Sequence, residues 1–261
     1  MKKYLNLFAI IFTFTIVLTF TETTRAQYQY NYSSNMWVNS GMNLLFQKRW
    51  ATARIRAAGK TQLADALEGR TASGRQTVAP SENVLRRVPL TQTSFKANPS
   101  PIMPSVLAAN FAEGGDAAVR QFVKVSGELL KNYEQMLITN RETRLKNNVA
   151  GAATFALMMS RSVLTGKDLT EKQAEAVLQD INSLLASSEN FRQLPDDEKQ
   201  KMYEVFVITS GLAAMLHQQG IEENNAEKSA QGKDLAKTIL SQFFDRPLDE
   251  IEFTEQGVQF P

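Results

Sequence analysis

The chain has 261 residues, a formal net charge of +2 and no cysteine. The absence of cysteine excludes disulfides, thiolate metal sites, a thiol nucleophile and acylation on cysteine as in bacterial lipoproteins. A chain of this length can nevertheless bury a core large enough to be stable without cross-links.

The first 26 residues have the layout of a signal peptide. Met1–Tyr4 gives a short positive start, Leu5–Phe20 is mostly apolar, and Thr24 and Ala26 form a small-residue cleavage pattern. An uncleaved anchor is the alternative, but the apolar run is shorter than the roughly 20 residues that span a bilayer. We therefore expect export through the Sec pathway to the periplasm or the extracellular space, with Gln27 as the first mature residue and no transmembrane segment after it.

Charge is divided between two parts of the expected mature chain. Residues 27–100 hold ten Lys and Arg against three Asp and Glu, whereas residues 101–261 hold sixteen against twenty-three. Such asymmetry can indicate an anionic partner, such as nucleic acid, for the basic part. Because the basic residues are dispersed rather than clustered, the sequence favours attraction between the two parts of one molecule over a nucleic-acid or membrane partner.

Two segments precede the helical part of the chain. Residues 27–43 are polar without a helical period and predict a flexible mature N-terminus. Residues 44–68 predict a basic amphipathic helical segment, broken near Gly59, whose modest apolar face favours docking on the acidic part of the chain. Its basic face could instead lie on an anionic membrane or polysaccharide. The apolar face holds Leu45, Trp50 and Leu63, and the weak candidates for binding an anion are Arg49, Arg54 and Arg56.

Residues 69–104 form a proline-rich linker that contains five of the eight prolines. Proline removes a backbone donor and disfavours helix at the preceding residue. Apolar residues at positions 84, 85, 88, 90 and 95 predict that the linker runs as an ordered strap along a folded body.

Residues 105–261 predict a bundle of about five long helices, so the fold class is all-α. The expected helices run from about 116 to 140, 144 to 164, 170 to 185, 195 to 219 and 225 to 244. Asp116, a capping box of Thr170 with Gln173, and Pro195 followed by three acidic residues mark three of the starts. The tail after Pro247 predicts a short strand.

Two of these helices are predicted to form the centre of the bundle. VAGAATFALMM in one and VFVITSGLAAML in the other are apolar on nearly every face, which is typical of helices buried on all sides. Each carries small residues that would let helix axes approach closely, Gly151–Ala153 in one and Gly211, Ala213 and Ala214 in the other. The other helices are expected to surround this pair.

Few catalytic motifs are available to this sequence. His217 is the only histidine, which excludes two-histidine metal sites, and we expect it to cap the C-terminal end of its helix. GxSxG and GxGxxG are absent, and AGKT at 58–61 fails as a phosphate loop because Arg54 stands where the first glycine is required. The sequence therefore predicts no catalytic residue, no metal site and no cofactor. Three glutamates with apolar neighbours are expected on solvated helix faces: Glu128, Glu134 and Glu204.

Asn147 and Asn148 open one of the two apolar helices and are the weak binding candidates of the bundle, together with Tyr133 one helix earlier. An amide close to a buried helix must find hydrogen-bond partners. The sequence favours a bridge to a neighbouring helix, and a small pocket lined with Tyr133 is the alternative.

Several stretches together resemble DUF6683, a family of bacterial exported proteins of unknown function. They are the exported start, the strap with TSFKANPSP, and the helical stretches NNVAGAATFALMMSRSVLTGKDLT and FRQLPDDEKQKMYEVFVITSGLAAML. The resemblance covers residues 95–257 and depends chiefly on the NxVA helix start, the TG turn and the LPDDEKQ helix start. It implies an all-helical fold and brings no activity, cofactor or catalytic residue.

Two functions stay open at this point. The favoured one is a non-enzymatic module that binds another envelope or extracellular component, because the sequence combines a signal peptide and a split charge with missing catalytic motifs. The alternative is a carboxylate-dependent hydrolase of cell-wall glycan or peptide, whose acids are recognised by separation and environment rather than by sequence spacing.

Overall fold

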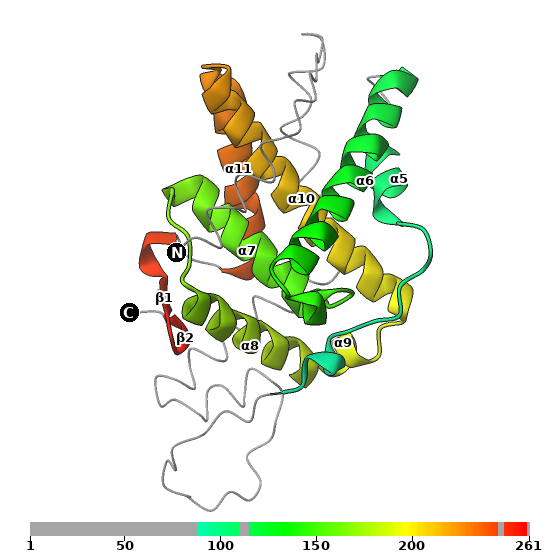
Figure 1. The fold of residues 1–261 in the computed structure, drawn as a ribbon, viewed down its shortest axis with the longest axis vertical. Helices are drawn as coiled ribbons and strands as arrows, with labels where there is room; N and C mark the ends of the chain where they lie inside the picture. Colours follow the sequence, from blue (N-terminus) through cyan, green and yellow to red (C-terminus); the bar gives the residue numbers. More distant parts are fainter. Residues whose placement is uncertain (1–87, 110–114, 245–247, 260–261) are drawn as a thin grey trace, which may run out of the picture.

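A computed structural model describes residues 88–109, 115–244 and 248–259 (Figure 1). The expected signal peptide, the segment 27–43 and the basic segment 44–68, with its three arginine candidates, lie outside these residues. The described part contains seven α-helices, three 3-10 turns and one two-stranded sheet. The α-helices are α5 (Met103–Ala108), α6 (Gly115–Thr139), α7 (Val149–Thr165), α8 (Glu171–Ser187), α9 (Glu189–Arg192), α10 (Asp196–Glu222) and α11 (Ala226–Phe243). The 3-10 turns are η2 (Leu90–Gln92), η4 (Thr143–Leu145) and η5 (Leu248–Glu250), and the strands are β1 (Glu252–Thr254) and β2 (Gly257–Gln259).

Five long helices build the body, as the sequence predicted: α6, α7, α8, α10 and α11 (Figure 1). α10 packs along both α7 and α11, while α7 also contacts α8 and α11. α7 and α10 bury twelve and thirteen residues, about twice as many as any other helix of the described part. The all-α bundle around two central apolar helices is therefore confirmed. None of the helices in this part of the chain is long and apolar enough to cross a membrane.

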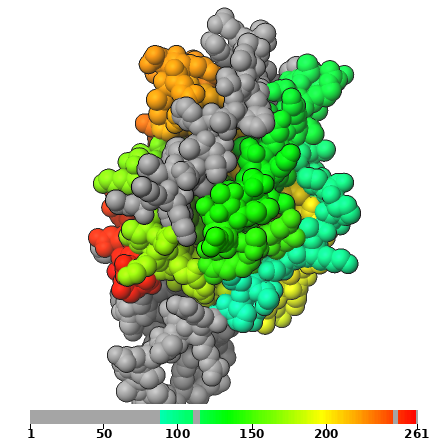
Figure 2. Space-filling model, viewed as in Figure 1, coloured from blue at the N-terminus to red at the C-terminus, as the bar shows by residue number. Residues whose placement is uncertain are grey.

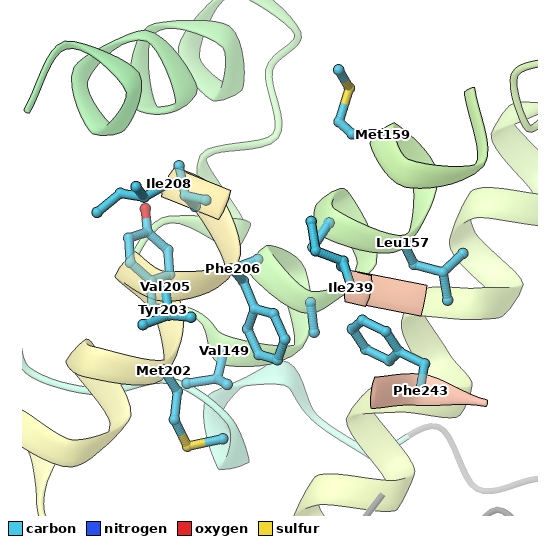
Figure 3. Close-up of a cluster of buried hydrophobic side chains, with 14 of the residues drawn as sticks. Val149, Leu157, Met159, Met202, Tyr203, Val205, Phe206, Ile208, Ile239 and Phe243 are labelled. Carbon is cyan, nitrogen blue, oxygen red and sulfur yellow. The ribbon is translucent and has the colours of Figure 1, made fainter. Parts of the chain in front are cut away.

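Aromatic and aliphatic side chains fill the space between α7, α10 and α11 (Figure 3). Phe206 of α10 stacks on Phe243 of α11 with ring centroids 5.6 Å apart. Val149, Leu157 and Ile239 around them are each at most 1% exposed. Burying a side chain of this size contributes about 1.5–3 kcal/mol, so this cluster supplies a large share of the stability of the bundle.

The sequence signals mark the start of α8 and the end of α7 correctly, whereas Asp116, expected to cap a helix, lies in the first turn of α6 after Gly115. Thr170 and Gln173 form the predicted capping box of α8, since the Thr170 hydroxyl accepts from Gln173 N at 3.3 Å and the Gln173 side chain accepts from Thr170 N at 2.9 Å. Asn225 caps α11 by accepting from Lys228 N at 3.0 Å. Gly166 ends α7 in the left-handed conformation, with φ 67°. These caps satisfy backbone groups that the helix itself leaves unpaired.

Two predicted helix boundaries are wrong. The helix expected from about 144 begins at Val149, because 143–145 forms the turn η4 and Asn147 has a left-handed φ of 54°. The helix expected to end before Gly220 continues to Glu222. His217 therefore lies inside α10 and not at its end, and its Nδ1 is 2.9 Å from the Ser229 hydroxyl of α11 instead of capping a helix.

Glycines set the distance between α10 and α11. A Cβ atom added at Gly232 would lie 2.5 Å from His217 N and 2.7 Å from Ala213 O, and one at Gly220 would lie 2.3 Å from Ser229 N. These neighbours are backbone atoms, so no side-chain rotation could relieve the overlap. α7 and α10 do pack together as predicted, but Gly211 faces Leu129 of α6, and the contacts of helix backbone on backbone join α10 to α11.

The tail forms a small antiparallel hairpin of β1 and β2, in which Phe253 pairs with Val258. The hairpin lies against α8, where the Gln173 side chain donates to Phe253 O at 2.6 Å and Asp180 accepts from Val258 N at 3.0 Å. The predicted short strand is thus one half of a two-stranded unit, which depends on α8 because an isolated hairpin is marginal at best.

Gly232→Ala tests the glycine contact between α10 and α11. The added methyl group must push the two backbones apart, and we expect it to lower the free energy of unfolding by about 1–3 kcal/mol, as overpacking does. Gly127→Ala on α6 is the matched control: its Cβ meets nothing within 4 Å, and alanine should stabilise the helix by roughly 0.5–1 kcal/mol. Urea unfolding measures both variants, and a Gly232→Ala protein as stable as the wild type would contradict this packing.

Candidate functional site

Residues 88–104 cross the body as a mostly irregular segment, hereafter the strap, whose last two residues begin α5. Because the strap has little regular secondary structure, its backbone donors and acceptors need partners from elsewhere. Four buried polar side chains from three helices supply them, and we call this set the strap junction. Its members are Asn148 at the start of α7, Asn182 of α8, and Gln200 and Glu204 of α10, all at most 4% exposed.

Asn148 is fully buried and joins the strap to the first turn of α7. Its Oδ1 accepts from Gly151 N at 2.8 Å as the helix cap, while its Nδ2 donates to Leu90 O at 2.8 Å and lies within 3.1 Å of the hydroxyls of Thr93 and Ser94. Backbone bonds continue the contact on both sides, from Val149 N to Thr93 O and from Phe95 N to Asn147 O, each at 3.0 Å. One amide therefore starts a helix and holds the strap at the same time.

Asn182 of α8 also binds the first turn of the strap. Its Nδ2 donates to Val88 O at 2.7 Å, and its Oδ1 accepts from the Thr93 hydroxyl at 2.7 Å. Thr93 is itself fully buried. Asn148 and Asn182 thus meet at one strap hydroxyl, which closes a network between α7, α8 and residues 88–94.

Gln200 and Glu204, one turn apart on α10, hold the second half of the strap. Gln200 accepts from Asn98 N at 2.7 Å and donates to Ser100 O at 3.2 Å. Glu204 Oε2 accepts from Ile102 N at 2.8 Å and from Met103 N at 2.7 Å, while its Oε1 accepts from Gln200 Nε2 at 2.7 Å. A carboxylate at the first N–H groups of a helix is favourable, so Glu204 acts as the cap that α5 does not find in its own sequence.

Aromatic rings pack beside these hydrogen bonds. Phe95 of the strap meets Tyr203 edge-on at 5.4 Å, Tyr203 meets Tyr133 of α6 at 5.8 Å, and Tyr133 meets Phe155 of α7 at 4.7 Å. Burial raises the pKa of Tyr133 well above its usual value, and the neighbouring Tyr203 adds to the rise. Burial also raises the pKa of Tyr203. Both phenols therefore stay neutral across the physiological pH range.

The structure brings together the three candidates that the sequence placed in the bundle. Asn148 holds the strap, Asn147 contributes its backbone carbonyl to Phe95, and Tyr133 reaches the strap through the ring of Tyr203. The amide partner of Asn148 is the strap and not a neighbouring helix, which differs from the favoured expectation. Of the three, only Asn148 belongs to the strap junction; Asn147 and Tyr133 lie beside it.

Sequence reasoning missed Asn182, Gln200 and Glu204. Glu204 was expected on a solvated helix face, yet it is only 3% exposed. A signal was present, because Glu204 interrupts the apolar run from Met202 to Ile208 in a helix that buries nearly every side. A charged residue in such a helix is expected to have a dedicated partner, and here the partner is the strap.

The remaining titratable groups do not gather at the junction. Glu134 forms an ion pair with Lys146 at 3.0 Å, and Glu128 lies in a partly buried position on α6. Burial, with Lys233 nearby, lowers the pKa of His217, so the imidazole beside Ser229 is neutral near pH 7. Over the described ranges no group of three or more His, Asp or Glu side chains could hold a metal ion. The side chains of the strap junction are thus suited to binding a peptide segment through its backbone.

Asp180 forms a separate contact between α8 and the C-terminal hairpin. Its Oδ2 accepts from Val258 N at 3.0 Å, and the carboxylate lies so close to Gly257 that a Cβ atom added there would overlap it. Burial raises the pKa of this carboxyl, and the hydrogen bond from Val258 only partly opposes the rise. The ionised form of Asp180 is thus less favourable in the folded protein than in the unfolded chain.

Asn148→Ala tests the strap junction. The variant loses the cap of α7, worth about 1 kcal/mol, and leaves buried strap acceptors without a donor, at about 1–3 kcal/mol. We expect the free energy of unfolding in urea to fall by about 2–4 kcal/mol. Asn225→Ala is the matched control, because Asn225 caps α11 in the same way without touching the strap. Equal losses in the two variants would show that the strap contacts of Asn148 contribute nothing.

Asp180→Asn tests the pH dependence of the hairpin contact. A carboxyl whose pKa is raised on folding stabilises the folded state when protonated, and this contribution is lost as the pH rises from the unfolded pKa through the folded one. The wild type should therefore lose stability relative to Asp180→Asn between about pH 3.5 and pH 7. Urea midpoints of both proteins at the two pH values measure the difference, and a difference independent of pH would contradict the burial of Asp180.

Comparison with known proteins identifies the family of this chain. A family model described as a family of unknown function, DUF6683, matches residues 6–261. Searches among curated proteins and among solved structures find no match. Since the family match extends over nearly the whole chain, the helical body and its strap included, this protein belongs to the DUF6683 family.

Proposed function

We propose that this protein is an exported, non-enzymatic module that binds another component of the cell envelope or the extracellular space. The signal-peptide pattern of residues 1–26 supports export. The excess of basic residues over 27–100 supports a partner with negative charge. One observation carries the non-enzymatic part: the two carboxylate oxygens of Glu204 accept three hydrogen bonds, two from the strap and one from Gln200.

A carboxylate-dependent hydrolase of cell-wall glycan or peptide is the competing proposal. For a glycan substrate, such an enzyme needs two carboxyl groups at about 5–10 Å across the scissile bond, with one of them free to protonate the leaving group. Glu204 is the most buried of the three glutamates that the sequence singled out, and its oxygens are occupied by the strap. The carboxylate of Glu134 forms an ion pair with Lys146. These contacts favour a structural role for both carboxylates over a catalytic one.

The contact with the partner is proposed to include Arg49, Arg54 and Arg56. Guanidinium groups bind carboxylates and phosphates through paired hydrogen bonds, so an anionic polysaccharide, an acidic protein surface or the headgroups of a peripheral membrane contact would suit them. An attraction of this kind is screened by salt within about 10 Å at 0.1 M ionic strength. Binding should therefore weaken as salt is added.

Capture from the envelope tests this function. We expect the tagged protein, cross-linked in cells that export it, to retain one envelope or extracellular component in a saturable and salt-sensitive manner. Replacing Arg49, Arg54 and Arg56 together by Gln should reduce the capture severalfold. The matched control replaces Arg120, Lys124 and Lys131 on α6 by Gln, which removes the same charge from an exposed helix face.

Two results would overturn the proposal. One is a purified protein that stays monomeric and captures nothing from repeated preparations. The other is turnover of cell-wall material by the wild type that is abolished by Glu128→Gln or Glu134→Gln without loss of stability, which would favour the hydrolase.

A further inference from the structure

The C-terminal half of α10 and the N-terminal half of α11 extend together as a two-helix arm, residues 211–234. The arm separates from α6 beyond the contact of Gly211 with Leu129 (Figure 1). In the space-filling view, the end of the arm in orange stands apart from the N-terminal end of α6 in green (Figure 2). The inner side of the arm is closed, because Ala213, His217 and Gly220 of α10 pack on Gly232 and Ser229 of α11.

An apolar stripe runs along α10 onto this arm. Val205 and Ile208 in the body are 6% and 0% exposed. Further along the same face come Leu212, Met215 and Leu216, which follow at helical spacing and are only partly buried. The stripe therefore continues from the covered body onto a part of the helix that the described elements cover incompletely. We call Leu212, Met215 and Leu216 the arm face.

The end of the arm carries negative charge. Residues 217–234 contain four Asp and Glu against two Lys, and Glu222, Glu223 and Glu227 are exposed. One of the two lysines, Lys228, is already paired with Glu223 at 2.7 Å. An apolar face beside an acidic end suits a basic amphipathic helix, which would place its apolar residues on the face and its cations near the carboxylates.

The chain itself contains a segment with these properties. Residues 44–68 combine Leu45, Trp50 and Leu63 with basic residues at helical spacing, within the part of the chain that is rich in Lys and Arg. Residues 69–87 connect this segment to the strap, and 19 residues can span up to about 60 Å. A body of this size measures about 40 Å across, so the segment can reach the arm face from Val88. A tether of this length gives an effective concentration in the millimolar range, so a weak contact is enough.

We infer that residues 44–68 dock within the same molecule on the arm face of α10, with Trp50 as the aromatic anchor and the acidic end of the arm as the electrostatic complement. This contact makes the basic and acidic parts of the chain one folded unit in the free protein. The inference does not rest on the proposed function, since it concerns the protein without any partner.

Tryptophan fluorescence tests the docking directly. The chain has two tryptophans, Trp37 and Trp50, and both precede the strap. In a Trp37→Phe background, emission therefore reports on Trp50 alone, in the exported protein as the host processes it. We expect blue-shifted emission that is protected from acrylamide. Adding Met215→Glu and Leu216→Glu should shift the emission to the red and raise the quenching constant severalfold, while Ile138→Glu on the exposed end of α6 should change neither.

A second pair of variants covers the case in which the double glutamate variant fails to fold, which circular dichroism would show. Glu222→Lys with Glu227→Lys reverses charge only at exposed positions of the arm and should also release Trp50. Glu252→Lys with Glu255→Lys on the hairpin makes the same change of charge elsewhere and should not. Added salt should raise the quenching constant in the background protein and leave it unchanged in the arm variant.

Three outcomes would overturn the inference. In the first, Trp50 is fully quenched and emits at long wavelength in the background protein. In the second, Trp50 is protected but responds to none of the arm substitutions, which places its contact elsewhere. In the third, the protection disappears on dilution, which assigns the arm face to a second copy of the chain instead of to its own segment.

Discussion

The structure depends on how an irregular segment can lie against the helices without leaving its buried backbone groups unpaired. A helix pairs its own N–H and C=O groups and a strand pairs them with its neighbours, but residues 88–102 contain only the short turn η2 and lie against the helices. Each buried backbone group left without a partner costs about 1–3 kcal/mol. The strap junction removes that cost, because its side chains pair with the backbone groups of the strap. In a sheet, the backbone of a neighbouring strand would do the same. The strap is thus a structural element of the bundle, although most of its bonds come from helices.

This arrangement changes the interpretation of the polar residues in the two central helices. Glu204 was expected on a solvated helix face but is a buried carboxylate, and a buried acid is a common feature of active sites. Its actual partners are two backbone N–H groups and an amide, which is the environment of a helix cap. The same holds for Asn148, which would be a ligand-binding candidate if the strap did not occupy its amide. Assigning these groups to the strap directs the search for function to the surface and to residues 27–87.

The sequence predicted those parts of the fold that depend on local signals. The capping box of Thr170 and Gln173, the glycine stop at Gly166 and the apolar helices α7 and α10 all follow from residues within one or two turns of each other. The misplaced start of α7 has a different origin. Asn148 begins the helix there because its side chain is fixed by a strap more than 50 residues earlier in the chain, and Asn147 adopts its left-handed φ beside Phe95.

The remaining differences also concern contacts distant in sequence. Gly220 was predicted as a helix stop because glycine commonly ends helices, but here it lets α11 approach the backbone of α10. Of the candidate site, Tyr133, Asn147 and Asn148 were predictable as polar or aromatic residues beside a buried helix. Asn182 was not identified, because only the position of the strap distinguishes it from a residue on a solvated helix face. Glu204 was missed although it interrupts the apolar run from Met202 to Ile208.

Native-state hydrogen exchange at the strap is the most direct test of this account. The amide protons of Phe95, Ile102 and Met103 donate to Asn147 O and to Glu204 Oε2, so their exchange reports on the junction itself. If the strap is an integral part of the fold, these protons will exchange only through the global unfolding that also exposes the core amides of α7. Exchange of the three protons at the rate of an exposed loop, while the amides of α7 stay protected, would contradict the central claim.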